Sequence, residues 1–216
     1  MDSAVRTNEK SRRKAVWGSG ICYALLIVLF ALTAAGCGEV ARTGTSPAYL
    51  IITNLEGASG AEPDEFGNTV HSDIVTVVDD VPTTFNDLGE VSMILAMRDP
   101  GTATQPTEPT SANFITVQRY RVRYIRADGR NTPGVDVPYG FDGAITMTVR
   151  TGEVTAGFEL VRHIAKHEAP LAALAANGVI ISTIAEITFF GFDQVGREVS
   201  VTGRMLVDFG NFGDPE

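Results

Sequence analysis

Alternation of apolar and polar residues along short segments is the sequence feature that most limits how this chain can fold. Residues 198–209, EVSVTGRMLVDF, place apolar side chains at Val199, Val201, Met205, Val207 and Phe209, with polar residues between most of them. Residues 144–149, AITMTV, alternate in the same way. Successive side chains of a β-strand point to opposite faces, so this period indicates strands with one buried face. The chain is therefore predicted to be a β-sheet protein.

Eight segments predict strands, separated by clusters of Gly, Pro, Asp and Asn. They are residues 48–55, 73–78, 90–97, 114–127, 144–149, 158–165, 179–192 and 198–209. One short helix is predicted at 168–178, EAPLAALAANG, with Pro170 in the first turn and Asn177-Gly178 at its end. Its flanks are predicted strands, so we expect this helix to be a crossover between two sheets.

Strands without long helices predict an all-β fold, an antiparallel sandwich of about eight strands with one short crossover helix. The closing segment FFGFDQVGREVSVTG (189–203), with a turn at 193–196, resembles the last strand pair of many bacterial immunoglobulin-like domains. That resemblance implies an immunoglobulin-like sandwich. An antibody-type domain is not expected, because the sole tryptophan, Trp17, lies near the amino end and no Cys–Trp–Cys spacing occurs.

The amino end is predicted to be a secretory signal. Five basic and two acidic residues lie within residues 1–20, and the uncharged run ICYALLIVLFALTAA follows at 21–35. A basic leader and an apolar run of about 15 residues are typical of a signal peptide. A permanent transmembrane helix would need about 20 apolar residues. We therefore expect residues 1–36 to be removed.

Residues 33–37, TAAGC, resemble the lipobox of bacterial lipoproteins, with Ala34, Ala35 and Gly36 ahead of Cys37. The family prefers Leu where this chain has Ala34. The resemblance implies cleavage before Cys37, a diacylglycerol on its sulfur and frequent acylation of its new amino group. Two or more acyl chains make a stable membrane anchor. The alternative is a free thiol in a secreted protein, which an oxidising compartment disfavours.

The predicted organisation is a signal peptide at 1–36, a lipidated N-terminus and tether at 37–47, and a β-sandwich domain at 48–216. In the lipoprotein family, residues after the cysteine influence sorting. Gly38 and Glu39 stand here instead of an aspartate, so we expect the outer membrane if the host has two membranes. Cys22 leaves with the signal and Cys37 is acylated, so no disulfide is expected. The core alone must hold the domain, which its length allows.

The histidines suggest two catalytic or metal sites, and we favour neither. His71, Ser72 and Asp73 carry the side chains of a hydrolase triad, but on a strand Ser72 would point away from the other two. His163 and His167 have the spacing of zinc ligands on a helix, yet residues 158–165 alternate as a strand does. Surface histidines near a turn are the simpler interpretation. No phosphate-binding glycine loop occurs, so neither an enzyme nor a cofactor is expected.

The loop at 56–68 offers a calcium alternative, because Glu56, Glu62, Asp64 and Glu65 supply several oxygens. The spacing of a calcium-binding loop is missing, however, and exposed acidic loops are common in acidic proteins. Loops 56–68 and 128–140 remain the places where a small ligand, such as a sugar, would bind if the protein were an enzyme or a solute-binding protein.

Charge is the least ordinary feature of the chain. No Lys or Arg occurs between Arg42 and Arg98, whereas nine acidic residues do. Removing residues 1–36 takes five of 17 basic and two of 26 acidic residues, leaving 12 and 24, a net charge of −12. That charge opposes binding to nucleic acid. Lys166 is then the only lysine, so the positive groups are almost all guanidinium groups, which suit paired contacts with carboxylates.

Three arginines, Arg119, Arg121 and Arg123, are predicted to share one face of a strand, and they form the candidate interaction site. Ile115 and Val117 occupy the same phase upstream, so the phase shifts near Gln118, which suggests a bulge. The row either pairs with acidic neighbours across the sheet, which we favour, or faces an acidic partner or anionic lipid head groups.

The expected function is that of an envelope lipoprotein acting as a non-catalytic binding or structural module. Its expected partners are membrane lipid, through Cys37, and an acidic envelope protein. The alternatives are a loop-based sugar- or calcium-binding protein, an enzyme accessory subunit, or a subunit of a surface assembly.

Overall fold

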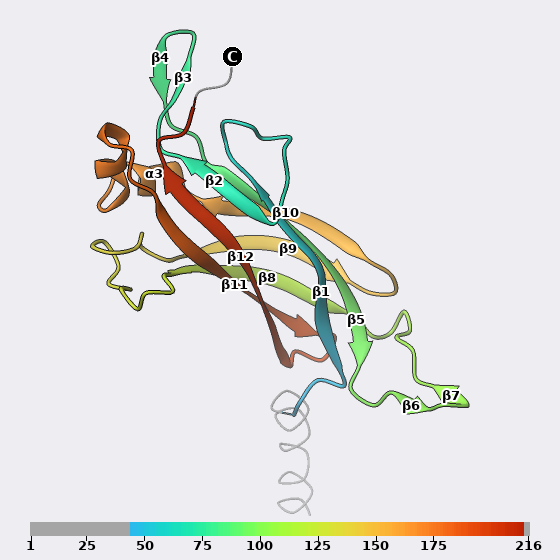
Figure 1. Ribbon diagram of the computed structural model, residues 1–216. Coiled ribbons are helices and arrows are strands. Elements are labelled where there is room, and N and C mark those ends of the chain that lie inside the picture. Colours follow the sequence, from blue (N-terminus) through green and yellow to red (C-terminus); the bar gives the residue numbers. More distant parts are fainter. Residues whose placement is uncertain (1–43, 214–216) are drawn as a thin grey trace, which may run out of the picture. The chain divides into compact units, whose positions relative to one another are not determined.

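Figure 1 shows the computed structural model, which describes residues 44–213. Two sheets enclose one core. The smaller sheet has the order β1 (Ala48–Ala58), β5 (Asp87–Met97), β10 (Val154–Val161). The larger has the order β2 (Thr69–Asp73), β12 (Glu198–Gly210), β11 (Ile181–Asp193), β8 (Ile115–Ile125), β9 (Phe141–Val149). The predicted signal peptide, Cys37 and most of the predicted tether lie outside the described residues.

The all-β prediction is confirmed, and eight strands form the two sheets. The prediction of a wholly antiparallel arrangement is wrong at one edge, because β2 pairs with β12 in parallel. The segment before β2 folds back along the end of β1, where Gly57 and Gly67 exchange two hydrogen bonds of 2.9 Å. Alternation within a strand carries no information about such a fold-back, since it reports only which face is buried.

Two small hairpins complete the described strands. One consists of β3 (Thr76–Val78) and β4 (Val81–Thr83), joined by Asp79 and Asp80 with φ of 51° and 64°. Both turn residues are thus in the left-handed region that a two-residue hairpin turn of the primed type uses. The other consists of β6 (Gly101–Thr102) and β7 (Gln105–Pro106). The predicted strand at 73–78 was wrong in its middle, because β2 ends at Asp73 and β3 begins at Thr76.

The crossover between the sheets differs from the predicted single helix. It contains a short α-helix, α3 (His163–Lys166), and a 3₁₀ helix, η1 (Leu171–Ala176). These helices join β10 of one sheet to β11 of the other, so the predicted crossover is confirmed. The predicted strand at 158–165 is wrong beyond Val161. The chain turns there and brings the ammonium group of Lys166 inward to the buried carboxylate of Asp87. Because the two residues are far apart in sequence, local alternation could not predict this turn.

The bulge suggested near Gln118 is present. The pairing of β8 shifts register between Val117 and Arg119 toward β9, and at the same place toward β11. Gln118 and Arg119 both point away from the core, which moves the buried positions from Ile115 and Val117 to Tyr120 and Val122. Gly191 lies opposite the bulge, where a Cβ atom would clash with the carbonyl oxygen of Thr116. Only glycine fits that position without a shift of the backbone.

Aromatic rings fill the space between the two sheets. Phe189 of β11 is fully buried, and its ring centroid lies 5.4 Å from that of Phe158 on β10. Tyr120 of β8 meets Phe158 at 5.2 Å, edge to face. Aromatic pairs in this geometry contribute stability beyond the area that they bury. The cluster therefore joins strands of both sheets at the centre of the core.

Replacing Phe189 by Ala should lower the free energy of unfolding by about 3–5 kcal/mol, because the cavity left in a fully buried site cannot collapse completely. Chemical denaturation measures the change. Phe192→Ala on the same strand is the matched control, since Phe192 is 39% exposed. An equal loss in both variants would contradict the central role of this cluster.

Candidate functional site

The arginine row, Arg119, Arg121 and Arg123, lies on the outer face of the larger sheet. These side chains alternate along β8 with the buried residues Tyr120, Val122 and Tyr124, as the sequence predicts. The hydroxyl groups of Tyr120 and Tyr124 fix β8 on its core side through hydrogen bonds to the backbone of β10. The hydroxyl of Tyr124 donates to the carbonyl oxygen of Leu160 at 2.7 Å, and the amide of Glu159 donates to the hydroxyl of Tyr120 at 3.1 Å. Both bonds reach β10 in the other sheet, so the row sits on a fixed strand.

Two members of the row share one carboxylate. Arg121 donates to Asp142 of β9 through Nε at 2.7 Å and Nη2 at 3.1 Å, and Arg119 donates to it at 3.3 Å. The hydrogen bond from Arg121 is the main reason that the pKa of Asp142 is lowered from the ordinary carboxyl value. The pairing interpretation of the row is thus observed for Arg119 and Arg121.

Arg123 is placed differently. In the sheet register it lies opposite Glu186 of β11. That carboxylate is already engaged by Arg204 of β12, whose Nη2 and Nε donate to Oε2 at 2.6 and 3.0 Å. The side chain of Arg123 forms no hydrogen bond or ion pair with any of residues 44–213. Two guanidinium groups thus flank one carboxylate, and the charge of Arg123 is left available on an exposed face.

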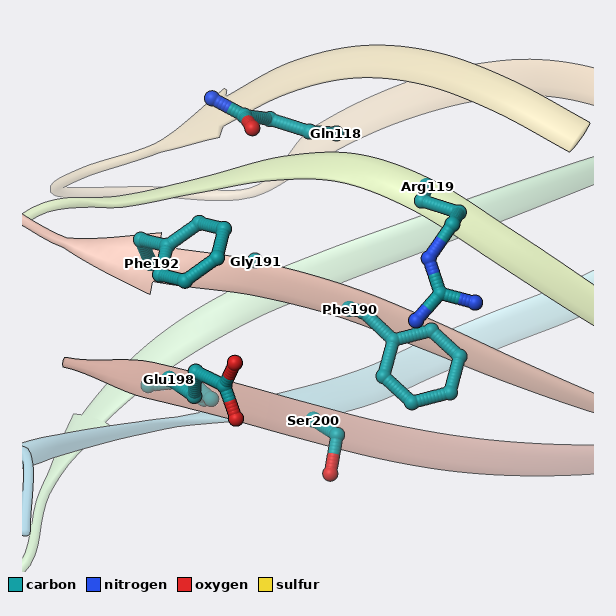
Figure 2. A pocket seen from close by; sticks show the side chains of 8 residues that line it. Gln118, Arg119, Phe190, Gly191, Phe192, Glu198 and Ser200 are labelled. Carbon is teal, nitrogen blue, oxygen red and sulfur yellow. The ribbon is translucent and has the colours of Figure 1, made fainter. Parts of the chain in front are cut away.

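A shallow cavity of about 640 Å³ opens beside the row, between β8, β11 and β12. Figure 2 shows Gln118, Arg119, Phe190, Phe192, Glu198 and Ser200 around it. The guanidinium carbon of Arg119 lies 4.0 Å from the centre of the Phe190 ring, a cation–π contact. The bulge at Gln118 and the missing side chain at Gly191 make room for the cavity. It offers hydrogen-bonding groups, one charge of each sign and an exposed ring, which suit binding.

The structure separates His71 from Ser72, in agreement with the expectation that residues 71–73 form no hydrolase triad. His71 is exposed on β2 and lies 3.7 Å from Asp208, whereas Ser72 is fully buried. Asp73 is buried as well and accepts hydrogen bonds from the hydroxyl of Thr76 and the amide of Phe212. A triad needs its serine, histidine and carboxylate within hydrogen-bond reach of one another. His71, Ser72 and Asp73 therefore do not form a triad.

His163 and His167 are both exposed at the ends of α3. His163 uses its backbone amide and Nδ1 to contact the side-chain oxygen of Asn86, at 2.6 and 2.9 Å. Within residues 44–213, no group of three His, Cys, Asp or Glu side chains could hold a metal ion. The acidic residues Glu62, Asp64 and Glu65 of loop 56–68 are exposed.

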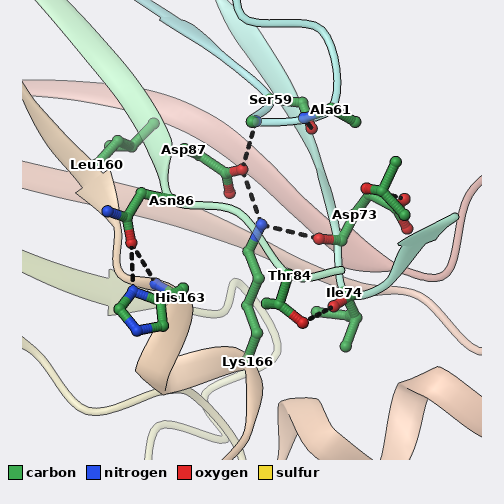
Figure 3. Close-up of polar contacts among 12 residues, drawn as sticks. Ser59, Ala61, Asp73, Ile74, Thr84, Asn86, Asp87, Leu160, His163 and Lys166 are labelled. Atoms are coloured by element: carbon green, nitrogen blue, oxygen red, sulfur yellow. Dashed lines mark hydrogen bonds and ion pairs between the residues drawn. The ribbon is translucent and has the colours of Figure 1, made fainter. Parts of the chain in front are cut away.

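A buried ion pair that the sequence analysis missed lies beside α3 (Figure 3). The ammonium group of Lys166 donates to Oδ1 of Asp87 and to the backbone oxygen of Asp73, both at 2.8 Å. The amide of Gly60 donates to the same carboxylate at 2.9 Å. Burial raises the pKa of Asp87, while Lys166 acts to lower it. The pair connects the 59–61 segment, β2, β5 and α3, so its role is structural. The only signal in the sequence was the single lysine of the predicted mature chain.

The two loops proposed for small ligands have modest cavities. Loop 128–140 borders one of about 280 Å³, and Phe66 of loop 56–68 borders one of about 320 Å³. Loop 128–140 is closed by its own contacts, since Arg130 pairs with Asp136 at 2.9 Å. No helix among residues 44–213 is long and apolar enough to cross a membrane.

No protein-family model matches the chain, and no curated protein sequence matches it. Among solved structures, the chain is similar to the crystal structure of Spo0M, a sporulation control protein from Bacillus subtilis, at 12% identity and a TM-score of 0.25. The likeness covers 76% of this chain and 49% of that one, so the chain spans about half the length of Spo0M. A TM-score this low indicates neither a shared fold nor a shared function.

Replacing Lys166 by Ala should destabilise the protein by about 3–5 kcal/mol, because it leaves the Asp87 carboxylate buried without its counter-charge. The double variant Lys166→Met, Asp87→Leu should be less damaging, since it removes both charges and keeps the volume filled. Chemical denaturation of both variants measures the difference. If the double variant is the less stable of the two, the pair does more than neutralise its own charges.

The ion pair of Asp142 should appear in its titration. The folded pKa of Asp142 is lowered, so the pair stabilises the protein above the ordinary carboxyl pKa, and this stability is lost as pH falls through the lowered value. Titration followed by NMR should show this low pKa in the wild type and a return toward the ordinary range in Arg121→Gln. Arg150→Gln, at an exposed position outside the row, is the control. An unchanged pKa in Arg121→Gln would mean that another group holds the carboxylate ionised.

Proposed function

We propose that this protein is a lipid-anchored, non-catalytic binding module of the bacterial cell envelope. The lipobox resemblance supports the anchor at Cys37, and Gly38 and Glu39 support the outer membrane in a host with two membranes. The two-sheet core and the closing hairpin β11–β12 support assignment to the immunoglobulin-like sandwiches, from which the parallel edge strand β2 is a departure.

The observation that carries the proposal is the uncompensated positive charge on a rigid face. Arg123 has no partner within residues 44–213, and Arg119 and Arg121 share the single carboxylate of Asp142. The folded sheet already holds the backbone of the row in place, so only the arginine side chains lose conformational freedom when a carboxylate surface binds. The binding partner is therefore an acidic protein surface, which guanidinium groups contact through paired hydrogen bonds.

A second candidate function is small-ligand binding in the cavity beside Arg119. The exposed ring of Phe192 and the polar groups of Gln118, Glu198 and Ser200 would suit a sugar. A ligand at 100 times its dissociation constant stabilises the folded state by about 2.7 kcal/mol. Thermal shift against a panel of sugars therefore tests this candidate. Binding that survives Glu198→Ala and Phe192→Ala would exclude the cavity as its site.

Crosslinking in cells, followed by detergent extraction and mass spectrometry, tests the binding proposal. The wild type should retain one stoichiometric envelope partner, and the variant with Gln at Arg119, Arg121 and Arg123 should lose it. Arg150→Gln, which removes a charge outside the row, should retain it. Recovery of the same partner by the triple variant would show that the row is not the binding face.

Replacing Cys37 by Ser should prevent lipidation, because the serine hydroxyl cannot take the place of the thiol as acyl acceptor. The full chain should then stay uncleaved or leave the membrane fraction, which fractionation and intact mass measure. Cys22→Ser lies within the predicted signal and should leave the mature protein unchanged. A Cys37→Ser chain that still fractionates with membranes at the mature mass would refute the anchor.

A further inference from the structure

The outer face of the smaller sheet is acidic. Its three strands, AYLIITNLEGA, DLGEVSMILAM and VTAGFELV, contain no Lys, Arg or His. Glu56 of β1, Glu90 of β5 and Glu159 of β10 occupy positions on the side away from the core. Glu153, just before β10, accepts a hydrogen bond from Thr53 of β1 at 2.5 Å. We call the surface formed by these four glutamates the acidic face.

The centre of the acidic face holds two like charges side by side. Glu56 and Glu90 lie directly opposite each other in the antiparallel register. Residues opposite each other across strands have Cβ atoms about 5 Å apart, where like charges destabilise the sheet. Neither carboxylate forms an ion pair with any residue in the described part of the chain. Glu159 differs, since Arg162 lies 3.5 Å from it. Glu56 and Glu90 are thus an unneutralised pair, since the nearby cations Arg162 and Arg98 contact Glu159 and the ring of Tyr49 instead.

The arginine row and the acidic face lie on opposite sides of the molecule, because the core separates the two sheets. The row cannot reach the acidic face of its own chain. Residues two apart on a strand are about 6.7 Å apart, so Arg123 and Arg121, which shares the Asp142 carboxylate with Arg119, are spaced nearly as the Glu56–Glu90 pair is. Their flexible side chains can cover the small difference.

We propose that the arginine row of one copy binds the acidic face of a second copy, so that the chains associate head to tail. This inference rests on the proposed binding function and names its partner as another molecule of the same chain. The contact is heterologous, because two different surfaces meet, and it can therefore continue from copy to copy. It also relieves the repulsion between Glu56 and Glu90.

The interaction should be weak for a single pair of molecules. Three strands, the longest of 11 residues, form a face of roughly 500 Å² from the usual strand spacings. Stable interfaces bury about 800 Å² on each partner. Anchoring through Cys37 would confine the copies to one membrane and raise their effective concentration, as linking two binding modules does. Association is thus expected on membranes rather than in dilute solution.

Charge reversal tests the proposal with the full chain. Two copies with different epitope tags are co-expressed in a bacterial host, crosslinked in the intact cells, extracted in a mild detergent and purified through one tag. The acidic-face variant carries Glu56→Arg and Glu90→Arg, and the row variant carries Arg121→Glu and Arg123→Glu. Each variant keeps the surface that the other lacks. Charge-neutral versions, with Gln at the same positions, serve if a reversal prevents folding.

Wild-type copies should co-purify, and each reversed variant paired with itself should lose at least about tenfold of the recovered second tag, because like charges then meet. Co-expression of the two different variants should restore co-purification, since one intact row meets one intact acidic face. Restoration would also show that both variants fold. Arg150→Glu and Glu108→Arg, at exposed positions that belong to neither surface, should leave recovery unchanged.

Two results would overturn the inference. One is that wild-type copies do not co-purify. The other is that they do, but the mixed variants, each with a cooperative melting transition close to the wild type, are not restored. If crosslinking still captures a different envelope protein through the row, the proposed binding function stands without self-association. If neither copies nor any other protein is captured, both proposals fail together.

Discussion

The packing of β8 against the smaller sheet is the interaction on which the rest of the structure depends. Tyr120 and Tyr124 bury their rings in the core, and their hydroxyls make hydrogen bonds to the backbone of β10. A slip of one residue would send both tyrosines to solvent and the arginines into the core, which fixes the register of the strand. The same alternation that stabilises the fold thus holds the arginine row on the surface.

The bulge at Gln118 changes which residues of β8 face the core. It lets one strand bury Ile115 and Val117 on one side of the bulge and Tyr120 and Val122 on the other. Gln118 and Arg119, the two outward residues at the bulge, line the cavity that Figure 2 shows. A bulge next to a binding surface is a common way for a sheet to redirect side chains. The fold and the candidate site are therefore consequences of the same local irregularity.

Much of the fold could be predicted from alternation alone. A strand with one buried face has apolar residues at every second position, so its sequence shows where it lies. The strands around Val91, Ile145, Phe189 and Val207 were predicted close to their observed limits. The phase shift at Gln118 was also visible in the sequence. The parallel pairing of β2 and the helix α3 were not predicted, since both depend on contacts distant in sequence. The clearest example is Lys166, which reaches Asp87 across 79 residues.

For the candidate site, the sequence identified which arginines share a face but not which of them are neutralised. That distinction needed the positions of Asp142, Glu186 and Arg204, which lie on three other strands. Of the acidic face, the sequence showed only the part with Glu56 and Glu90, as a stretch without Lys or Arg between Arg42 and Arg98. Strand pairing then brought Glu56 and Glu90 together. Acidic residues and arginines that are separated along the chain thus lie on opposite faces of the folded domain.

The most direct test of the account is the capture of the binding partner by the single variant Arg123→Gln, with its melting temperature measured in parallel. Arg123 has no partner in the described part of the chain, so the account predicts an unchanged melting temperature and a marked loss of capture. Full capture by this variant would contradict the account, because the member of the row without an ion pair among residues 44–213 would then have no part in binding.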